Sequence, residues 1–320
     1  MRTYAIFGHC LRSEIDFPDL DLVEHETPRW TLRVSDEPIP VRAAELLGEE
    51  DIGGGTIARL YRSASEYRLA YDDDTGTFDV SRNGQEITWF PVPNPDIEMV
   101  RLHVIGRVLA AALHAGGMYC LHGSGVVVGD VAVGLVAPRF WGKSTLALCM
   151  AKAGGRLLSD DTLAIDPDEA RPRVWPGVHS VRLWGDSVTQ VGEDDPARGA
   201  PAFDVKRTLR SLPDVILARE PAPLAAVYLL APQDPGAIVS IANRVRVGAV
   251  PAALSLIGHA KIGALLGGSE AGQVFDAAVR LAARVPVYRL EFPRDFQSIQ
   301  AVVAQLGEWH RAPERETVTA

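Results

Sequence analysis

The chain has 320 residues, of which 47% are hydrophobic, so it can bury a large core and has the length of roughly two domains. Its net charge is −9 at pH 7 and its pI is about 5.4, which argues against a broad basic surface for nucleic acid or membranes. Three cysteines give no disulfide framework, no run reaches about 18 uninterrupted apolar residues, and the first residues lack a signal-peptide pattern. We therefore expect a cytoplasmic protein that binds neither nucleic acid nor a membrane.

Residues 1–93 are predicted to form a mostly β N-terminal domain. The sequence Arg-Asn-Gly-Gln at 82–85 separates two β-favouring runs, Thr77–Ser81 and Glu86–Phe90, and is a strong hairpin signal. The three aspartates at 72–74 lack the remaining spaced ligands of a calcium loop, which favours a solvated turn. Further short β-favouring runs lie at 4–10, 30–34, 58–62 and 67–71.

The proline-rich segment 91–95 marks a boundary, and residues 94–117 are expected to form a connecting helix. Its two apolar stripes imply burial on more than one side. From 118 to 310, strand-like and helix-like segments alternate, which indicates an α/β domain. The polar residues 311–320 are expected to form a flexible tail. Strands are predicted at 119–121, 126–128, 131–136, 156–159, 162–166, 224–230 and 287–292, and helices at 143–153, 250–266, 270–284 and 296–310.

The segment 137–145, Ala-Pro-Arg-Phe-Trp-Gly-Lys-Ser-Thr, is the most informative part of the chain. It follows an apolar strand-like run and opens a helix-like run, which is the context of a Walker A phosphate loop. Backbone N–H groups and a helix N-terminus together form an anion site there, with Lys143 reaching the phosphates and Ser144 a ligand of Mg²⁺. The pattern departs from the motif because Ala137 replaces its first glycine, and because Phe140 and Trp141 replace small residues.

Two adjacent aspartates, Asp160 and Asp161, follow a short apolar run after the predicted loop and helix. The carboxyl end of a strand beside a phosphate loop is where a carboxylate that binds Mg²⁺ belongs. One carboxylate could contact the metal ion while the other accepts a proton from an attacking hydroxyl. In isolation such a pair is a solvated turn, but its position after the loop favours the functional interpretation. His122 precedes the loop strand and could bond a phosphate or tune a carboxylate, although its local sequence alone favours a histidine packed at a strand end.

These segments resemble the C-terminal domain of HPr serine kinase/phosphorylase, a phosphate-loop fold related to phosphoenolpyruvate carboxykinase. The likeness covers about residues 118–310. The N-terminal segments Phe7-Gly8, 12–15 and 17–20 resemble the diverged HPr-kinase-like proteins of peptide natural-product pathways, some of which phosphorylate lasso-peptide precursors on serine. The matching C-terminal segments are 121–124, 137–146, 157–161, 176–177, 181–184, Lys206 and 285–290.

The resemblance implies an HPr-kinase-type α/β domain preceded by a smaller mostly β domain, and an ATP-dependent kinase that uses Mg²⁺. Its acceptor would be a serine-type hydroxyl of a peptide or small protein, and a homo-oligomer is an option by analogy. The implied catalytic residues are His122, Asp160, Asp161, Arg182 and Lys206. The implied nucleotide-binding residues are Ala137, Arg139, Trp141, Gly142, Lys143, Ser144 and Thr145. The implied metal ligands are Ser144, Asp160 and Asp161.

Two other functions remain open at this stage. Phe140 and Trp141 could block the nucleotide site and leave a non-catalytic module that binds a peptide or protein. Alternatively, the acceptor could be the hydroxyl of a free small molecule. The sequence does not tell which aspartate of the pair is the base.

Overall fold

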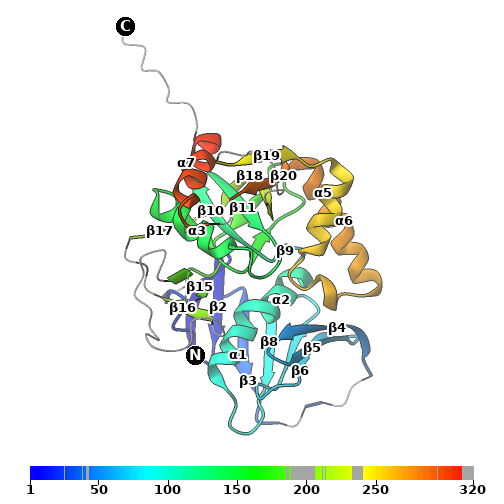
Figure 1. Ribbon diagram of the computed structural model, residues 1–320. Helices are drawn as coiled ribbons and strands as arrows, with labels where there is room; N and C mark the ends of the chain where they lie inside the picture. Colours follow the sequence, from blue (N-terminus) through cyan, green and yellow to red (C-terminus); the bar gives the residue numbers. More distant parts are fainter. Residues whose placement is uncertain are drawn as a thin grey trace.

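The computed structural model describes residues 1–311 apart from 25, 38, 41–42, 185–186, 189–205, 211, 213, 233–240 and 294. Within these residues the strands form an eight-stranded sheet, a ten-stranded sheet and a two-stranded ribbon, so the fold is mixed α/β (Figure 1). The predicted tail at 312–320 lies outside the described residues. No helix in the described part of the chain combines the length and the apolarity needed to cross a bilayer.

The eight-stranded sheet is built from the first 90 residues, in the order β1-β2-β3-β8-β7-β6-β5-β4. Alternation specifies its strands: in β6, Tyr67, Leu69 and Tyr71 are buried and the residues between them are partly exposed. The predicted hairpin at 82–85 is confirmed, since β7 and β8 pair antiparallel around it. The bounds are β1 Arg2–Ile6, β2 His9–Ser13, β3 Trp30–Val34, β4 Glu45–Gly53, β5 Thr56–Arg62, β6 Glu66–Tyr71, β7 Thr77–Ser81 and β8 Glu86–Phe90.

One predicted strand, at 4–10, is wrong. The chain turns back at Phe7 and Gly8, which have φ values of 49° and 69°, and β1 and β2 pair antiparallel around them. The sequence hid this turn because Phe7 is apolar and fully buried, as a strand residue would be. Gly8 also lies against Trp175, whose ring would be 2.1 Å from a β-carbon at that position. The turn is therefore fixed by its packing as well as by glycine.

A continuous helical segment lies between the two large sheets. It comprises α1 (Ile97–His103), a π-helical turn η1 (Val104–Val108) and α2 (Leu109–Ala115). Its apolar side chains belong to one core cluster that includes the inner face of the eight-stranded sheet and strands of the second sheet. Burial on more than one side is thus confirmed. The two predicted domains share this core through the helix, so the boundaries at 93 and 117 fall within one packed unit.

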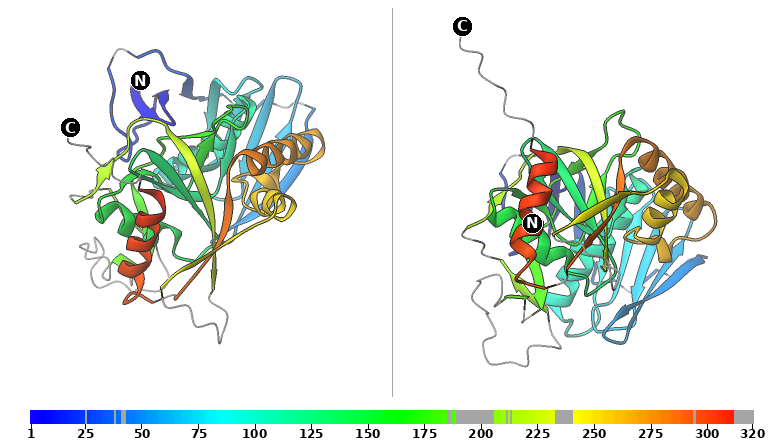
Figure 2. Two further views of the ribbon diagram at one scale, coloured as in Figure 1. Left: turned by 90° about the horizontal axis from the view of Figure 1, so that it is seen from above. Right: turned by 45° about the horizontal axis from the view of Figure 1, so that its top comes forward.

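The ten-stranded sheet carries helices on both faces (Figure 2). In β11, Val133 and Leu135 pack under α3 and α7, while Ala132 and Val136 face the core that contains α5 and α6. This two-sided burial explains the nearly continuous apolar sequence of the strand. The strands are β9 Tyr119–Leu121, β10 Gly123–Val128, β11 Val131–Val136, β12 Arg156–Ser159, β13 Leu163–Ile165, β14 Arg173–Trp175, β17 Ile216–Leu217, β18 Ala222–Pro232, β19 Asn243–Arg246 and β20 Val287–Phe292. The helices are α3 Lys143–Lys152, α5 Ala249–Gly258, η2 Gly263–Leu265, α6 Gly268–Arg284 and α7 Ile299–His310.

The helix predicted at 250–266 is shorter than expected. It ends at Gly258, and the following residues turn toward β9, where the Lys261 N–H donates to the Cys120 carbonyl at 2.8 Å. His259 likewise accepts a hydrogen bond from the His122 N–H at 2.8 Å. Tertiary hydrogen bonds therefore override the apolar sequence that favoured a longer helix.

Strand direction brings three segments of the chain to one edge of the sheet. β10 pairs antiparallel with both β11 and β12, so these two strands point the same way, and the start of β10 lies beside their carboxyl ends. β18 and β20 run parallel to β11, so their carboxyl ends reach the same edge. In open α/β sheets, ligands bind outside the carboxyl ends of the strands. The loop before α3, the aspartates after β12 and His122 all lie here.

Candidate functional site

The loop between β11 and α3 closes on the side chain of Lys143. Its ammonium donates to the carbonyl oxygens of Ala137 at 2.8 Å and Pro138 at 3.1 Å, so it ties the start of the loop to the helix. Gly142 precedes the helix with a φ of 80°, and Phe140 has a φ of 66°. A left-handed conformation at a non-glycine residue costs about 1–2 kcal/mol, which the surrounding structure must hold in place. The loop thus keeps a bent form without the motif's first glycine.

Asp160 is linked to the first turn of α3. It is 3% exposed, and its Oδ1 atom accepts hydrogen bonds from the hydroxyls of Ser144 at 2.8 Å and Ser124 at 2.6 Å. Its Oδ2 atom accepts from the backbone N–H of Arg182 at 3.2 Å. A buried carboxylate needs such partners. Asp160 is therefore held against Ser144, the serine that the sequence predicts as a ligand of Mg²⁺.

Asp161 points to a different set of groups. Its carboxylate forms an ion pair with the ammonium of Lys261, and its Oδ1 atom is 3.3 Å from His122 Nδ1. Burial would raise the pKa of Asp161, but the charge of Lys261 and the contact with His122 outweigh it and hold the pKa well below its usual range. The residue has a φ of 72°, a region that aspartate and asparagine enter more readily than most side chains. Its side chain is still 42% exposed, so a ligand in the cavity can reach it.

His122 lies beside Asp161, and its surroundings favour the neutral form of the ring at pH 7. Burial lowers its pKa, and the charges of Lys261 and Lys143 lower it further against the opposing effect of Asp161. Its Nδ1 atom is 3.1 Å from the carbonyl oxygen of Asp161, so we assign the ring proton to Nδ1. The Nε2 atom then carries a lone pair. A neutral His122 therefore accepts a hydrogen bond at Nε2 and does not donate one to a phosphate oxygen.

The three other basic residues implied by the resemblance differ in position. Arg182 lies in β15 (Val181–Trp184) and lines the same cavity as the aspartates, and its buried Nε atom has no hydrogen-bond partner among the described residues. Arg139 also lines the cavity, but its guanidinium donates to the carbonyl of Ile52 in β4 at 2.6 Å. Lys206 is the first residue of β16 (Lys206–Leu209), and its side chain lies outside the described part of the chain.

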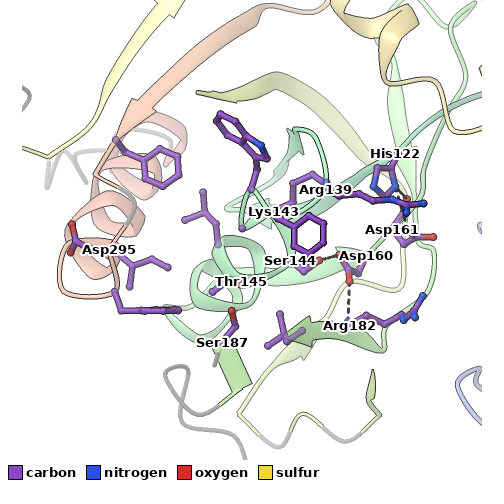
Figure 3. A pocket seen from close by; sticks show the side chains of 18 of the residues that line it. His122, Arg139, Lys143, Ser144, Thr145, Asp160, Asp161, Arg182, Ser187 and Asp295 are labelled. Atoms are coloured by element: carbon purple, nitrogen blue, oxygen red, sulfur yellow. Dashed lines mark hydrogen bonds and ion pairs between the residues drawn. The ribbon is translucent and has the colours of Figure 1, made fainter. Parts of the chain in front are cut away.

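One cavity of about 380 Å³ joins these groups. Figure 3 shows His122, Asp161 and Arg182 on one side of it and Asp295 on the opposite side. The residues between them come from the start of α3: Lys143, Ser144 and Thr145. This volume is in the range of small-ligand pockets. The cavity therefore has a charged end near Asp161, a central region at the start of α3 and a second end near Asp295.

The oxygen atoms near Ser144 fit a magnesium ion. Ser144 Oγ and Asp160 Oδ1 are hard ligands at the N-terminus of α3. Mg²⁺ in phosphate-transfer sites takes one or two carboxylates and completes its coordination with substrate phosphates and water. Among the described residues, no group of three or more His, Cys, Asp or Glu side chains could hold a metal ion by itself. Asp161 fits this role less well because its carboxylate is paired with Lys261.

The sequence interpretation missed Lys261. It lies in the segment after α5, 100 residues beyond Asp161, and its side chain is only 6% exposed. Burial lowers its pKa and the charge of Asp161 opposes this shift. No spacing or motif connects the two residues, and the lysine reaches the site because the chain turns toward β9. A single lysine within the otherwise mostly apolar run predicted as a helix at 250–266 was the signal available.

Comparisons with known proteins give a distant structural likeness. No protein-family model matches the sequence, and no curated protein matches it either. Among solved structures, the chain is similar to the HPr(Ser) kinase/phosphatase from Coxiella burnetii, with 12% sequence identity and a TM-score of 0.31. The match covers 58% of this chain and 95% of that chain. A likeness at this TM-score carries no argument about function, which has to come from the residues of the site.

Proposed function

We propose that this protein is an ATP-dependent kinase that transfers the γ-phosphoryl group to a hydroxyl. The observation that carries the proposal is the meeting of Ser144 and Asp160 at 2.8 Å at the start of α3, with Lys143 beside them and Asp161 at the adjoining end of one cavity. A phosphate-binding loop, a hard-oxygen metal site and a second carboxylate are the parts that phosphoryl transfer requires.

The two aspartates have separate roles in this proposal. Asp160, bonded to Ser144, would hold Mg²⁺ together with that serine, and the ion would neutralise charge on the phosphates. Asp161 would accept the hydrogen bond of the acceptor hydroxyl and orient it for in-line attack. Its low pKa is compatible with this role, because a loose transition state needs positioning more than a strong base. Arg182 would place positive charge near the transferred group.

The acceptor is proposed to be a serine-type hydroxyl of a peptide or small protein, and a natural-product precursor peptide is one such acceptor. Asp161 is 42% exposed in the cavity, so a side-chain hydroxyl can approach it. A free small-molecule hydroxyl would fit the same chemistry. A screen of serine peptides against hydroxylated metabolites, with transfer of labelled phosphate as the readout, separates these two classes of acceptor.

A non-catalytic binding module is the second candidate, and the conformation of the loop favours it. Phe140 lines the cavity, is 65% exposed and has a left-handed backbone. Lys143 is bonded to carbonyl groups of its own loop. If these residues exclude a triphosphate, Phe140→Gly should create nucleotide affinity that the wild type lacks. If the kinase proposal is right, that substitution leaves an existing affinity in place.

The deciding experiment is MgATP binding by calorimetry, followed by phosphoryl transfer. Lys143→Ala should abolish both, whereas Lys152→Ala, at the other end of the same helix, should change neither. Asp161→Asn should retain nucleotide binding and lose transfer, because the residue contacts the acceptor side. Full activity in Lys143→Ala, or normal turnover in Asp161→Asn, would refute the proposed roles.

A further inference from the structure

The end of the cavity away from Asp161 is built differently from the rest. Its walls are apolar and mostly aromatic, and they come from three segments that meet there: the phosphate loop, the end of β20 and the start of α7. Four apolar lining residues lie next to Asp295 in the sequence: Phe292, Pro293, Phe296 and Ile299. Trp141 of the loop packs against the same core as two of them, Phe292 and Ile299. Asp295 lies at the same end (Figure 3). This end of the cavity lies opposite the ion pair of Asp161. None of the five apolar residues named for it is basic.

Packing explains some of these residues but not Phe296. Phe292 is 7% exposed and belongs to the core beneath α3 and α7, and Trp141 and Ile299 pack against that core. Phe296 is 37% exposed and is not part of it. A large aromatic side chain that contributes little to the core and lines a cavity is available for a ligand.

The orientation expected for a bound nucleoside triphosphate places its base at this end of the cavity. Lys143 and Ser144 lie in the middle of the cavity, and the transferred phosphoryl group has to face Asp161. The remainder of the nucleotide must then leave toward Asp295. The carboxylate of Asp295 accepts the N–H of Ser298 at 2.8 Å and its hydroxyl at 3.1 Å. An acceptor-only anion there disfavours phosphate and favours a group that carries N–H or O–H donors.

We propose that the apolar end of the cavity is the nucleobase subsite, with Phe296 stacking on the base and Trp141 and Phe292 forming the wall around it. This inference rests on the proposed kinase function and adds to it the part of the donor that the protein recognises. The aromatic residue that departs from the phosphate-loop motif at Trp141 then contributes to nucleotide binding. Stacking of an aromatic side chain on a base changes affinity by about tenfold or more.

The test compares two ligands that share phosphates and differ in the nucleoside. Calorimetry with Mg²⁺ is carried out with ATP and with inorganic tripolyphosphate, on the wild type and on Phe296→Ala. The control is Phe275→Ala, which removes an exposed phenylalanine of α6 that does not line the cavity. Because Phe296 is exposed, its removal leaves the fold intact.

Support for the subsite requires three results together. The wild type binds ATP at least about tenfold more tightly than tripolyphosphate. Phe296→Ala loses about tenfold in affinity for ATP and keeps its affinity for tripolyphosphate. Phe275→Ala changes neither affinity. Equal affinity of the wild type for both ligands overturns the subsite and leaves the phosphate loop standing. The subsite is also overturned if Phe296→Ala weakens the binding of ATP and tripolyphosphate equally, or weakens the binding of neither. That result would indicate that an apolar side chain of the acceptor occupies this end. A wild type that binds neither ligand overturns the kinase proposal itself.

Discussion

The ion pair of Asp161 and Lys261 joins two side chains that differ sharply in exposure. The lysine side chain is 6% exposed and the aspartate side chain 42%. Removing one partner therefore leaves either a buried ammonium or a carboxylate that water can reach. We predict that Asp161→Asn destabilises the protein clearly more than Lys261→Met, although both break the same pair.

The expected magnitudes follow from what each substitution leaves behind. Removing one partner of a buried ion pair costs about 3–5 kcal/mol of unfolding free energy. The loss in Asp161→Asn should be about 3 kcal/mol, because the amide oxygen still accepts a hydrogen bond. Asparagine also tolerates the left-handed backbone at this position, so strain adds little. Lys261→Met keeps the apolar stem and leaves an aspartate that can be hydrated, so its cost should stay below about 1 kcal/mol.

Urea unfolding at pH 7 of both single variants and of the double variant measures this asymmetry. The double variant contains neither charge, so it should recover most of the loss seen in Asp161→Asn. Below about pH 4 the wild type should lose the stability that the lowered pKa of Asp161 provides, because the unfolded chain then binds the proton first. Equal losses in the two single variants, or strictly additive losses in the double variant, would refute the reasoning.

Two further predictions concern the fold. Gly8→Ala should cost about 3 kcal/mol in unfolding free energy, because it adds a left-handed alanine and a β-carbon 2.1 Å from the ring of Trp175. Gly54 also has a positive φ, but no atom lies within 4 Å of a β-carbon placed there, so Gly54→Ala should cost about 1 kcal/mol. Equal losses of unfolding free energy in the two variants would contradict a role for the contact with Trp175. Burial lowers the pKa of His310 to about 4, so unfolding free energy should fall by up to about 3 kcal/mol as pH drops from about 6.5 to 4. Denaturation across this range should show a smaller fall in His310→Gln, and an identical fall would exclude His310 as a cause.

The sequence predicted those elements whose pattern is set by local burial. β3 and β20 have the predicted bounds, Trp30–Val34 and Val287–Phe292, because each is a short run of mostly β-favouring residues with a buried face. β4, in contrast, was not predicted. Glu45–Gly53 contains four acidic residues and two glycines, lies at the edge of its sheet and has no fully buried residue. It is a strand because β5 pairs with it, and such pairing leaves no periodic signal in the strand itself.

The site likewise contains features that the local sequence predicts and features that only tertiary contacts determine. Lys143, Ser144 and the two aspartates lie within one strand-helix-strand unit, so their proximity could be inferred from chain order and strand direction. The different surroundings of Asp160 and Asp161 could not, because they depend on Ser124, on the backbone of Arg182 and on Lys261. Those contacts are made across the sheet, by segments whose positions only the packed structure defines.

The N-terminal sheet takes part in the site through the connecting helix. The π-helical turn brings Gly106 next to Asp161, since a β-carbon at that glycine would lie 4.0 Å from Oδ2 of the aspartate. In the same turn Arg107 binds Glu50 of β4 at 2.9 Å, and Arg139 in the loop before α3 donates to the carbonyl of Ile52 in that strand. Turns of this type widen the helix by one residue and are frequent at functional sites. An edge strand with no catalytic residue thus contacts both the helix behind Asp161 and the loop before α3, which gives the mostly β region a direct physical route to the geometry of the proposed active site.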